Sequence, residues 1–450
     1  RLCVYTLPQW GEGGNTCQML LPACVQSGTR CVERRCAVLL GSGRLLQLCS
    51  SRNLPQERSV GTTPAIGRVM NPSIDRLPTQ QSSGTYENEI IKIPWDRFKM
   101  AINTEVAFLA AQPKETIGLE EVLDCQSPAL ARKMIERMAP ARWATRISLI
   151  QSLDGWRKVP ELVELRDMLH NWYMRITHLA KDTDMEIFAK AITDILEAGQ
   201  PVVLMAARGI AQLETLPQCK YSRPELDEWL DRFLLSRIGT RMLLQQFIVV
   251  SRSSEFAYPK AGIVNLECDA VRVCKKAADL AQDICFRIAG RSPRVEVKAF
   301  QFTEEGSEEV KACYISYIPS HLQYMMLELL KNSMNATLKT AQDDRDLYDR
   351  IIHVTVTGDH QSVKIRIRDE ARGIPEHVCK RLFSYTGGDA ARTDDQIKAN
   401  ALAGFGVGLP LSRLHAWRLG GDLKIWSYPG MGTDATLTLK RMKTNWYHHH

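Results

Sequence analysis

The sequence predicts an α+β protein, in which a four-helix bundle precedes an α/β sandwich built on a mainly antiparallel sheet. Two observations carry this prediction. Between residues 101 and 255, apolar residues recur at three- and four-residue steps, as on the buried face of a helix. After residue 256, helical runs mix with stretches in which apolar and charged residues alternate, which is typical of strands with one solvated face. A chain of 450 residues is long enough for two or three domains.

Composition is that of an ordinary soluble globular protein, with 44% hydrophobic and 24% charged residues. The net charge of +7 is a mild excess that is spread along the chain. It favours an acidic partner weakly and does not indicate nucleic acid. No uninterrupted apolar run is long enough to cross a bilayer, so we expect no membrane span.

Cysteine usage favours a reducing compartment. Six of the 13 cysteines fall within the first 50 residues, and the others are scattered singly. Neither group contains a CxxC pair or a His/Cys cluster with the spacing of a zinc site.

Residues 1–100 are expected to be a mitochondrial targeting segment and a linker. Residues 1–60 contain seven arginines, no lysine and three acids, which is the composition of a transit segment. Residues 60–90 are rich in Thr, Ser, Pro, Gly and Gln, as linkers are. The alternative is an extension without function, or upstream sequence that is not normally present.

Residues 101–255 are expected to form the bundle domain. The apolar periodicity predicts four helices, at about 128–152, 160–181, 184–214 and 223–250. The second carries the stripe Leu162, Leu165, Met168, Leu169, Trp172, Ile176 and Leu179. The fourth begins with a capping box, Ser222 to Glu225, and continues with the stripe Leu226, Leu230, Leu234 and Ile238. His170 and His178 lie on the second helix, where we expect surface histidines and not phosphate acceptors.

Residues 256–446 are expected to form the α/β sandwich domain. A helix from about Val273 ends at Gly290, and three stretches alternate as strands do, around residues 295–297, 363–368 and 435–439. Helices gathered on one face of this sheet would complete an α+β sandwich.

The segment Glu328–Thr337, ELLKNSMNAT, carries the polar groups of greatest interest. As a helix it places Glu328 and Asn332 one turn apart on the same face, with Asn335 near the next turn. We expect Leu327, Leu330, Met334 and Leu338 to form a core-facing stripe on another face. Acid and carboxamide groups on a half-buried helix need a partner, and a magnesium ion with a triphosphate fits this chemistry.

Three glycine-bearing turns follow this helix in order. Asp369–Gly373 (DEARG) comes straight after a strand and offers a carboxylate to an adenine amino group. Gly404–Gly408 (GFGVG) leads into a helix, where backbone amides and the helix N-terminus attract phosphate. Gly430–Thr433 (GMGT) is a turn between two strands that places a hydroxyl near the base. Each motif is weak alone, but their order and flanks together predict an ATP site.

These four motifs resemble the N box and the three glycine boxes of the Bergerat ATP-binding fold, which gyrase, histidine kinases and mitochondrial protein kinases share. Within that superfamily the sequence is most similar to the 2-oxo acid dehydrogenase kinases. The resemblance covers about residues 128–446 and includes Leu230–Gln246, Tyr317–Leu322 and Ala403–Ala416. It implies a mixed, mainly antiparallel sheet, a mitochondrial matrix location, and phosphorylation of serine on the E1 component, which inactivates it, with pyruvate dehydrogenase as the first candidate. It also implies docking on lipoyl domains of the E2 core through the helical domain, and a homodimer.

The resemblance assigns roles to individual residues. Glu328 would be the general base that activates the substrate serine, and Asn332 would hold Mg²⁺ against the phosphates of ATP. The remaining expected nucleotide contacts are Lys331, Asn335, Asp369, Gly373, Gly404, Phe405, Gly406, Val407, Gly408, Leu409 and Thr433.

Some positions depart from the family pattern and leave the substrate open. Tyr324 stands where many members have histidine, as in branched-chain versions, and Ala371 replaces the first glycine of the DxGxG motif. The family's usual arginine is Asn335 here, and an expected Ser-Thr pair falls on Gly388 and Asp389. The alternatives are a branched-chain 2-oxo acid dehydrogenase kinase or a catalytically weakened module that binds the lipoyl core. A sensor histidine kinase is disfavoured, because neither His170 nor His178 is followed by a carboxylate.

Overall fold

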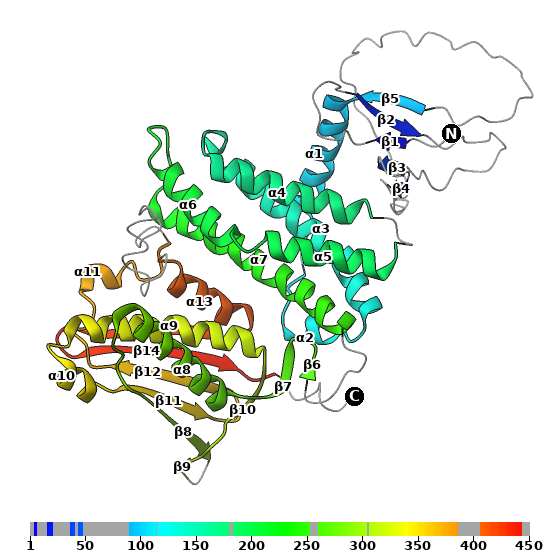
Figure 1. Ribbon diagram of the computed structural model, residues 1–450. Coiled ribbons are helices and arrows are strands. Elements are labelled where there is room, and N and C mark those ends of the chain that lie inside the picture. Colours follow the sequence, from blue (N-terminus) through cyan, green and yellow to red (C-terminus); the bar gives the residue numbers. More distant parts are fainter. Residues whose placement is uncertain are drawn as a thin grey trace, which may run out of the picture. The chain divides into compact units, whose positions relative to one another are not determined.

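The computed structural model in Figure 1 describes residues 90–113, 115–179, 183–252, 260–303, 306–385 and 406–442, together with four short strands before residue 50. Two units are described separately. One comprises Arg1–Asn103 and Thr177–Thr183, and the other comprises Thr104–Ile176 and Asp184–His450.

The first unit contains a five-stranded sheet. Its strands are β1 (Val4–Thr6), β2 (Thr16–Leu20), β3 (Ala37–Leu40), β4 (Arg44–Gln47) and β5 (Ile90–Pro94), in the order β1-β3-β2-β5 with β4 paired to β3. Most of residues 1–89, on which the targeting segment and the linker were predicted, lies outside the described residues. The targeting segment therefore stays a prediction.

The helical half contains more helices than predicted. In chain order they are α1 (Trp95–Ala111), α2 (Leu119–Leu123), α3 (Pro128–Gln151), the 3₁₀ turn η1 (Trp156–Lys158), α4 (Pro160–Thr177), α5 (Met185–Ala198), α6 (Val202–Glu214) and α7 (Arg223–Arg252). The predicted helices at 128–152, 160–181 and 223–250 correspond to α3, α4 and α7. Long helices of this half are drawn side by side in Figure 1, and α3, α5 and α6 all pack on α7.

The prediction of a single helix at 184–214 is wrong, because the chain forms two helices there. Helix α5 ends at Ala198 with Gly199 as its C-cap, and Pro201 stands at the N-cap of α6. Proline has no amide hydrogen for an intrahelical bond, and its ring disfavours helical geometry at the preceding residue. The apolar periodicity continues on both sides of this break, which is why the pattern alone suggested one helix.

Helix α7 is the central helix of the half. The Ser222 amide donates to Glu225 Oε2 at 2.7 Å, which is the half of the predicted capping box that the Glu225 side chain supplies. All four residues of the predicted stripe are buried, which confirms it: Leu226, Leu230, Leu234 and Ile238. By length and composition α7 could cross a membrane, but most of its apolar window is buried inside the fold. The helix is therefore explained as a core helix.

The expected stripe on α4 is mostly confirmed, whereas one histidine differs from its expectation. Leu162, Leu165, Leu169, Trp172 and Ile176 are buried, and Met168 and Leu179 are half-buried. His178, expected at the surface, is buried and follows the end of α4, and His170 is half-buried.

The second half of the chain forms the predicted sandwich. Its elements are β6 (Lys260–Ala261), β7 (Val264–Asp269), α8 (Ala270–Ala289), β8 (Val295–Thr303), β9 (Gly306–Glu309), β10 (Tyr314–Tyr317), α9 (Pro319–Thr340), α10 (Asp344–Asp349), β11 (Ile352–Gly358), β12 (Ser362–Asp369), α11 (Glu376–Cys379), α13 (Gly408–Arg418), β13 (Asp422–Tyr428) and β14 (Gly432–Lys440). The main sheet has the order β13-β14-β12-β11-β8-β9, and a smaller one has the order β10-β7-β6. Helices α8 and α9 pack together and against strands of the main sheet (Figure 1).

The main sheet is mixed and mainly antiparallel, as expected. Only β8 and β11 pair in parallel, and the four other neighbouring pairs are antiparallel. On β12 the apolar residues Val363, Ile365 and Ile367 are buried, whereas Lys364, Arg366 and Arg368 are exposed. This alternation places one face of the sheet against the helices and the other in solvent.

The sandwich contacts the helical half through α7. Asp231 on α7 accepts a hydrogen bond from the Tyr385 hydroxyl at 2.6 Å and one from Arg413 of α13 at 3.2 Å. The Arg418 guanidinium, also on α13, donates to the Leu235 carbonyl at 2.7 Å. These polar contacts join two parts of the chain that the sequence separates widely.

Candidate active site

Helix α9 presents polar side chains on one half-buried face. Its entry is shaped by Pro319 at the first helical position, where a missing amide hydrogen costs nothing. The half-buried residues include Glu328, Lys331, Asn332 and Asn335. All four predicted site residues of this segment therefore lie on one helix and remain partly accessible.

The core-facing side of α9 differs from the predicted stripe. Leu330 and Met334 are buried as expected, but Leu327 and Leu338 are only half-buried. The buried set consists of His321, Leu322, Met325, Met326, Leu329, Leu330, Ser333, Met334 and Thr337. The reason is that α9 packs against α8, α13, β7 and β12, so a wider arc is covered than a single helical stripe provides.

The Glu328 carboxylate lies between a lysine and the start of another helix. Its Oε1 atom is 2.7 Å from Lys331 Nζ, and both side chains are about one-sixth exposed, at 16% and 15%. A Cβ atom added to Gly408 would lie 2.3 Å from Glu328 Oε2, so this carboxylate packs directly on the glycine backbone. A purely structural role of Glu328 would explain its ion pair with Lys331. It would not explain the contact between the Glu328 carboxylate and Gly408.

Helix α13 begins at this point of contact. Val407 is its N-cap and Gly408 its first residue, and Gly406 before them has a φ of +73°, which favours glycine. Gly406, Val407, Gly408 and Leu409 are all half-buried. The first amides of a helix have no intrahelical acceptor and carry a partial positive charge, so this end can receive an anion. Gly404 and Phe405 lie outside the described residues.

Asp369 ends strand β12 and is 2% exposed. Its Oδ1 accepts a hydrogen bond from the Ala371 amide at 3.2 Å. The Ser333 hydroxyl on α9 and the Thr433 amide on β14 also donate to this carboxylate. Burial raises the pKa of Asp369, and these three hydrogen bonds act against that rise by stabilising the charged form.

The turn after Asp369 lies very close to the β13–β14 hairpin. Gly373 has a φ of +70°, and a Cβ there would lie 2.4 Å from the Tyr428 carbonyl oxygen. Gly432 has a φ of +125°, and its Cβ would lie 2.0 Å from the Asp369 carbonyl oxygen. Only glycine fits either position, because both the backbone angle and the space exclude a side chain.

Thr433 faces this turn from the hairpin. It pairs with Asp369 in the register of β12 and β14. Its hydroxyl lies 3.1 Å from that of Ser427, which accepts a 2.6 Å hydrogen bond from the Ile374 amide. The first and third glycine turns are therefore bound to each other.

Helix α9 connects the separate motifs. Glu328 touches the start of α13, and Ser333 binds Asp369, which is bound in turn to Thr433. Ser333 was not singled out from the sequence, although it lies inside ELLKNSMNAT between the two asparagines. Among the described residues, no group of three or more His, Cys, Asp or Glu side chains is placed to hold a metal ion.

Two family models match the chain. The one described as mitochondrial branched-chain alpha-ketoacid dehydrogenase kinase matches residues 124–265, within the helical half. The one described as histidine kinase-, DNA gyrase B- and HSP90-like ATPase matches residues 317–443, which include α9 and the three turns. The second match supports ATP as the nucleotide of this site.

Curated relatives match across both halves. The isozyme 4 of mitochondrial [pyruvate dehydrogenase (acetyl-transferring)] kinase from Rattus norvegicus is 33% identical over 358 residues, which is 76% of this chain and 84% of the relative. The human isozyme 4 is 38% identical over 221 residues, 49% of this chain and 52% of the relative. Isozyme 1 from Mus musculus is 29% identical over 365 residues, 77% of this chain and 82% of the relative. The chain therefore belongs to the mitochondrial 2-oxo acid dehydrogenase kinase family of ATP-dependent protein-serine kinases.

Proposed function

We propose that this protein transfers the γ-phosphate of ATP to a serine of the E1 component of the mitochondrial pyruvate dehydrogenase complex, and thereby inactivates it. The relatives named as pyruvate dehydrogenase kinases support this substrate. The observation that carries the proposal is the position of Glu328, a carboxylate packed on Gly408 at the N-terminus of α13. A base and a phosphate-attracting helix end then lie side by side.

Glu328 would act as the general base. It would accept the proton of the serine hydroxyl as the serine oxygen forms its bond to the γ-phosphorus. The bond between the γ-phosphorus and the bridging oxygen breaks, and ADP leaves with that oxygen. Lys331, 2.7 Å from Glu328, would hold the carboxylate in place and add positive charge beside the phosphates.

Magnesium is proposed on the chemistry of the available oxygen donors. Asn332 lies one turn after Glu328 on the half-buried face of α9, and its carboxamide oxygen is a hard ligand. Mg²⁺ usually takes one or two protein oxygens and completes its shell with phosphates and water, so this small set fits. When bound, the ion would neutralise charge on the phosphates. Asn335 would lie nearby and contact the nucleotide.

The adenine would be read by the turn after β12. Asp369 would accept a hydrogen bond from the adenine amino group, while Gly373 allows the close turn and Thr433 offers a hydroxyl beside the base. The support is that Asp369 is buried yet held by Ser333, Ala371 and Thr433, as a fixed acceptor should be. Gly404–Leu409 would surround the phosphates. The structure describes this segment from Gly406 onward.

The branched-chain 2-oxo acid dehydrogenase complex is a second candidate substrate. The match of residues 124–265 to the branched-chain kinase model favours it, as does Tyr324 one turn before Glu328. Incubation with labelled ATP and each purified complex separates the two. We expect serine labelling of pyruvate dehydrogenase E1; labelling of the branched-chain E1 alone would reassign the substrate, and labelling of neither would favour the lipoyl-binding module.

We further propose the location and the partners that the family resemblance implies. The protein would act in the mitochondrial matrix as a homodimer, without nucleic acid or a membrane span. Its helical domain, about residues 101–255, would bind the lipoyl domain of the E2 core, while residues 256–446 would hold ATP. A pull-down of the full chain by lipoylated E2 domain tests the docking, with unlipoylated domain as the control.

A further inference from the structure

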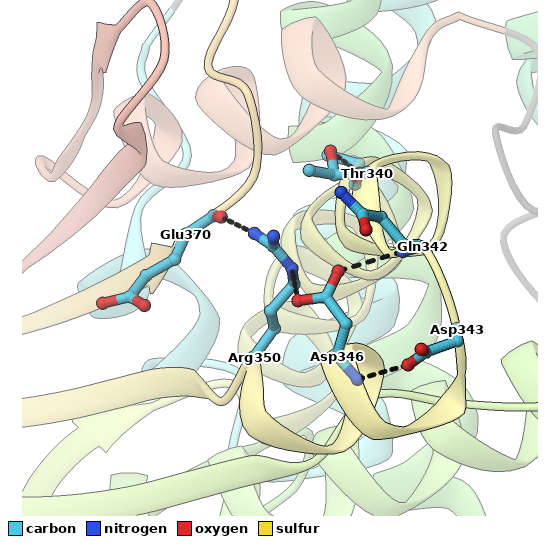
Figure 2. A network of polar contacts seen from close by, with 7 residues as sticks. Thr340, Gln342, Asp343, Asp346, Arg350 and Glu370 are labelled. Carbon is cyan, nitrogen blue, oxygen red and sulfur yellow. Dashed lines mark hydrogen bonds and ion pairs between the residues drawn. The ribbon is translucent and has the colours of Figure 1, made fainter.

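Arg350 links α10 to the turn that follows β12. It lies between α10 and β11 and its side chain is 27% exposed. Its Nε atom is 2.8 Å from Asp346 Oδ1, and its Nη1 donates to the Glu370 carbonyl oxygen at 2.7 Å. Figure 2 shows the guanidinium between these two acceptors.

Asp346 is held from the side of α9. Its Oδ2 accepts the Gln342 amide at 2.9 Å, and its own amide donates to Asp343 Oδ1 at 2.8 Å (Figure 2). Gln342 follows directly on the C-terminal end of α9, which closes with the Thr340 hydroxyl bound to the Ala336 carbonyl. The pKa of Asp346 is lowered, first by the Gln342 amide and then by Arg350, so the carboxylate stays charged. The orientation of Arg350 is therefore fixed by the end of α9.

The acceptor of Arg350 lies in the proposed adenine turn. Glu370 stands between Asp369, the proposed adenine acceptor, and Ala371, whose amide binds Asp369. On its other side the same turn is bound to the hairpin, where the Gly430 amide donates to the Arg372 carbonyl at 2.8 Å. Arg350 supplies the opposite attachment, from the C-terminal end of α10.

We propose that Arg350 is a positioning residue for the base of the nucleotide. By holding the Glu370 carbonyl, it fixes Asp369 relative to the helix that carries Glu328 and Asn332, and so sets the selectivity for adenine. This inference rests on the proposed adenine role of Asp369. It does not depend on which E1 is the substrate.

Arginine suits this role better than lysine does. Its planar guanidinium presents donors in a rigid fork, so one group binds the carboxylate through Nε and the carbonyl through Nη1. A lysine ammonium carries three donors on one atom and lacks the rigid planar fork that directs Nε and Nη1 at two separate acceptors. Arg350→Lys should therefore restore only part of what Arg350→Ala loses.

The test is nucleotide binding by the full chain, measured by calorimetry with ATP and with GTP. Arg350→Ala removes one charge-assisted hydrogen bond to the turn, so we expect the Kd for ATP to rise roughly three- to tenfold. The Kd for GTP should change less, because guanine has no amino group at the adenine position, and the preference for ATP over GTP should narrow. In turnover, KM for ATP should rise while kcat changes little.

Arg291→Ala is the matched control. Arg291 binds Asp344 of the same short helix at 3.1 Å but does not contact the turn. Its loss should leave both nucleotide affinities at their wild-type values, which separates positioning from a general effect on α10. An unchanged ratio of ATP to GTP affinity in Arg350→Ala would overturn the proposal, as would an equal change in Arg291→Ala. A wild-type protein that binds ATP but labels no E1 would contradict the proposed function and leave this test intact.

Discussion

At the residue scale, Asp369 illustrates how a buried charge is kept available for a ligand. Three hydrogen bonds stabilise its charged form against the cost of burial. We expect Asp369→Asn to weaken ATP binding by about 1.5–3 kcal/mol, because an acceptor with full charge is replaced by an amide. Calorimetric titration with ATP measures the loss.

The neighbouring acid Asp434 is the control for this substitution. It forms a bidentate pair with Arg366, with contacts of 2.9 and 2.6 Å, on the exposed side of the sheet. Asp434→Asn should weaken ATP binding less than Asp369→Asn does, because the Asp434 carboxylate is paired with Arg366 and acts on Asp369 through its charge alone. If Asp369→Asn binds ATP with wild-type affinity, Asp369 is not the adenine acceptor.

Two histidines illustrate the opposite case, in which burial keeps a group neutral. The rings of His321 on α9 and His415 on α13 lie 4.5 Å apart, and Tyr324 lies against His415 at 5.3 Å. Burial lowers the pKa of His321 to about 4 from its ordinary 6.5, and Arg241 on α7 adds to this. The pKa of His415 is also lowered, by burial and then by His321, Arg237 and Arg241.

Stability should therefore fall in mild acid. Between pH 6.5 and 4 the unfolded chain binds a proton at His321 that the folded chain does not, so protonation favours unfolding. The free energy of unfolding should drop by up to about 1.4 kcal/mol per pH unit for each such histidine. His321→Phe removes this group, so urea unfolding at pH 7 and pH 5 should differ less in the variant than in wild type. An equal difference would contradict the assignment.

At the scale of elements, the contact between α9 and α13 decides where Glu328 points. Gly408 lies within α13 and outside the positive-φ region, so alanine suits its backbone, but the added methyl would lie 2.3 Å from Glu328 Oε2. Gly408→Ala should displace the carboxylate and reduce the rate of phosphate transfer by about 10- to 100-fold, as misplacements near 1 Å do. The measurement is kcat with E1 as substrate.

A second helical glycine provides the control for that substitution. Gly239 lies in α7, and a Cβ there would meet its nearest neighbour, in Ile117, at 3.4 Å, an ordinary contact. Gly239→Ala should keep the wild-type kcat. If Gly408→Ala also keeps it, Glu328 is not held against α13 in the working enzyme.

Helix boundaries that are set by residues close by in the sequence can be predicted from the sequence. Ser222 with Glu225 marks the start of α7, and Gly290 with a φ of +70° ends α8, as expected. The break at Gly199 was missed because apolar periodicity continues across it. The buried arc of α9 was partly missed because it depends on which elements pack around the helix.

The residues of the candidate site also divide into those that the sequence predicts and those that only the fold identifies. Glu328, Asp369 and Thr433 could be selected because each is a reactive or hydrogen-bonding residue that lies beside a glycine motif or in the ELLKNSMNAT segment of α9. Ser333 and Arg350 could not, since their importance comes from partners that are distant in sequence. Arg350 and the Glu370 carbonyl, for example, are 20 residues apart and meet only in the fold.

At the scale of the whole molecule, Asp231 joins the helical half to the sandwich. Its carboxylate accepts from Tyr385 and Arg413, and burial raises its pKa while these two partners lower it. Asp231→Ala should lower the free energy of unfolding by about 1–3 kcal/mol, because two donors lose their acceptor. Urea denaturation measures this change.

An exposed ion pair between an aspartate and a lysine supplies the comparison for Asp231. Asp154 and Lys220 are 3.4 Å apart and more than half exposed, so Asp154→Ala should cost less than about 1 kcal/mol. Equal effects of the two substitutions would mean that the contact between α7 and α13 contributes no more than a surface pair does.

The role of Glu328 as the base of a serine kinase is tested with the whole protein and its E1 substrate. The measurement is transfer of labelled phosphate from ATP to serine of E1, made alongside ATP affinity, with Glu376→Gln on α11 as a matched exposed control. Glu328→Gln keeps the shape and removes the base, so we expect ATP binding to survive while transfer falls about 10²- to 10⁴-fold. Transfer at the wild-type rate in Glu328→Gln would exclude Glu328 as the general base.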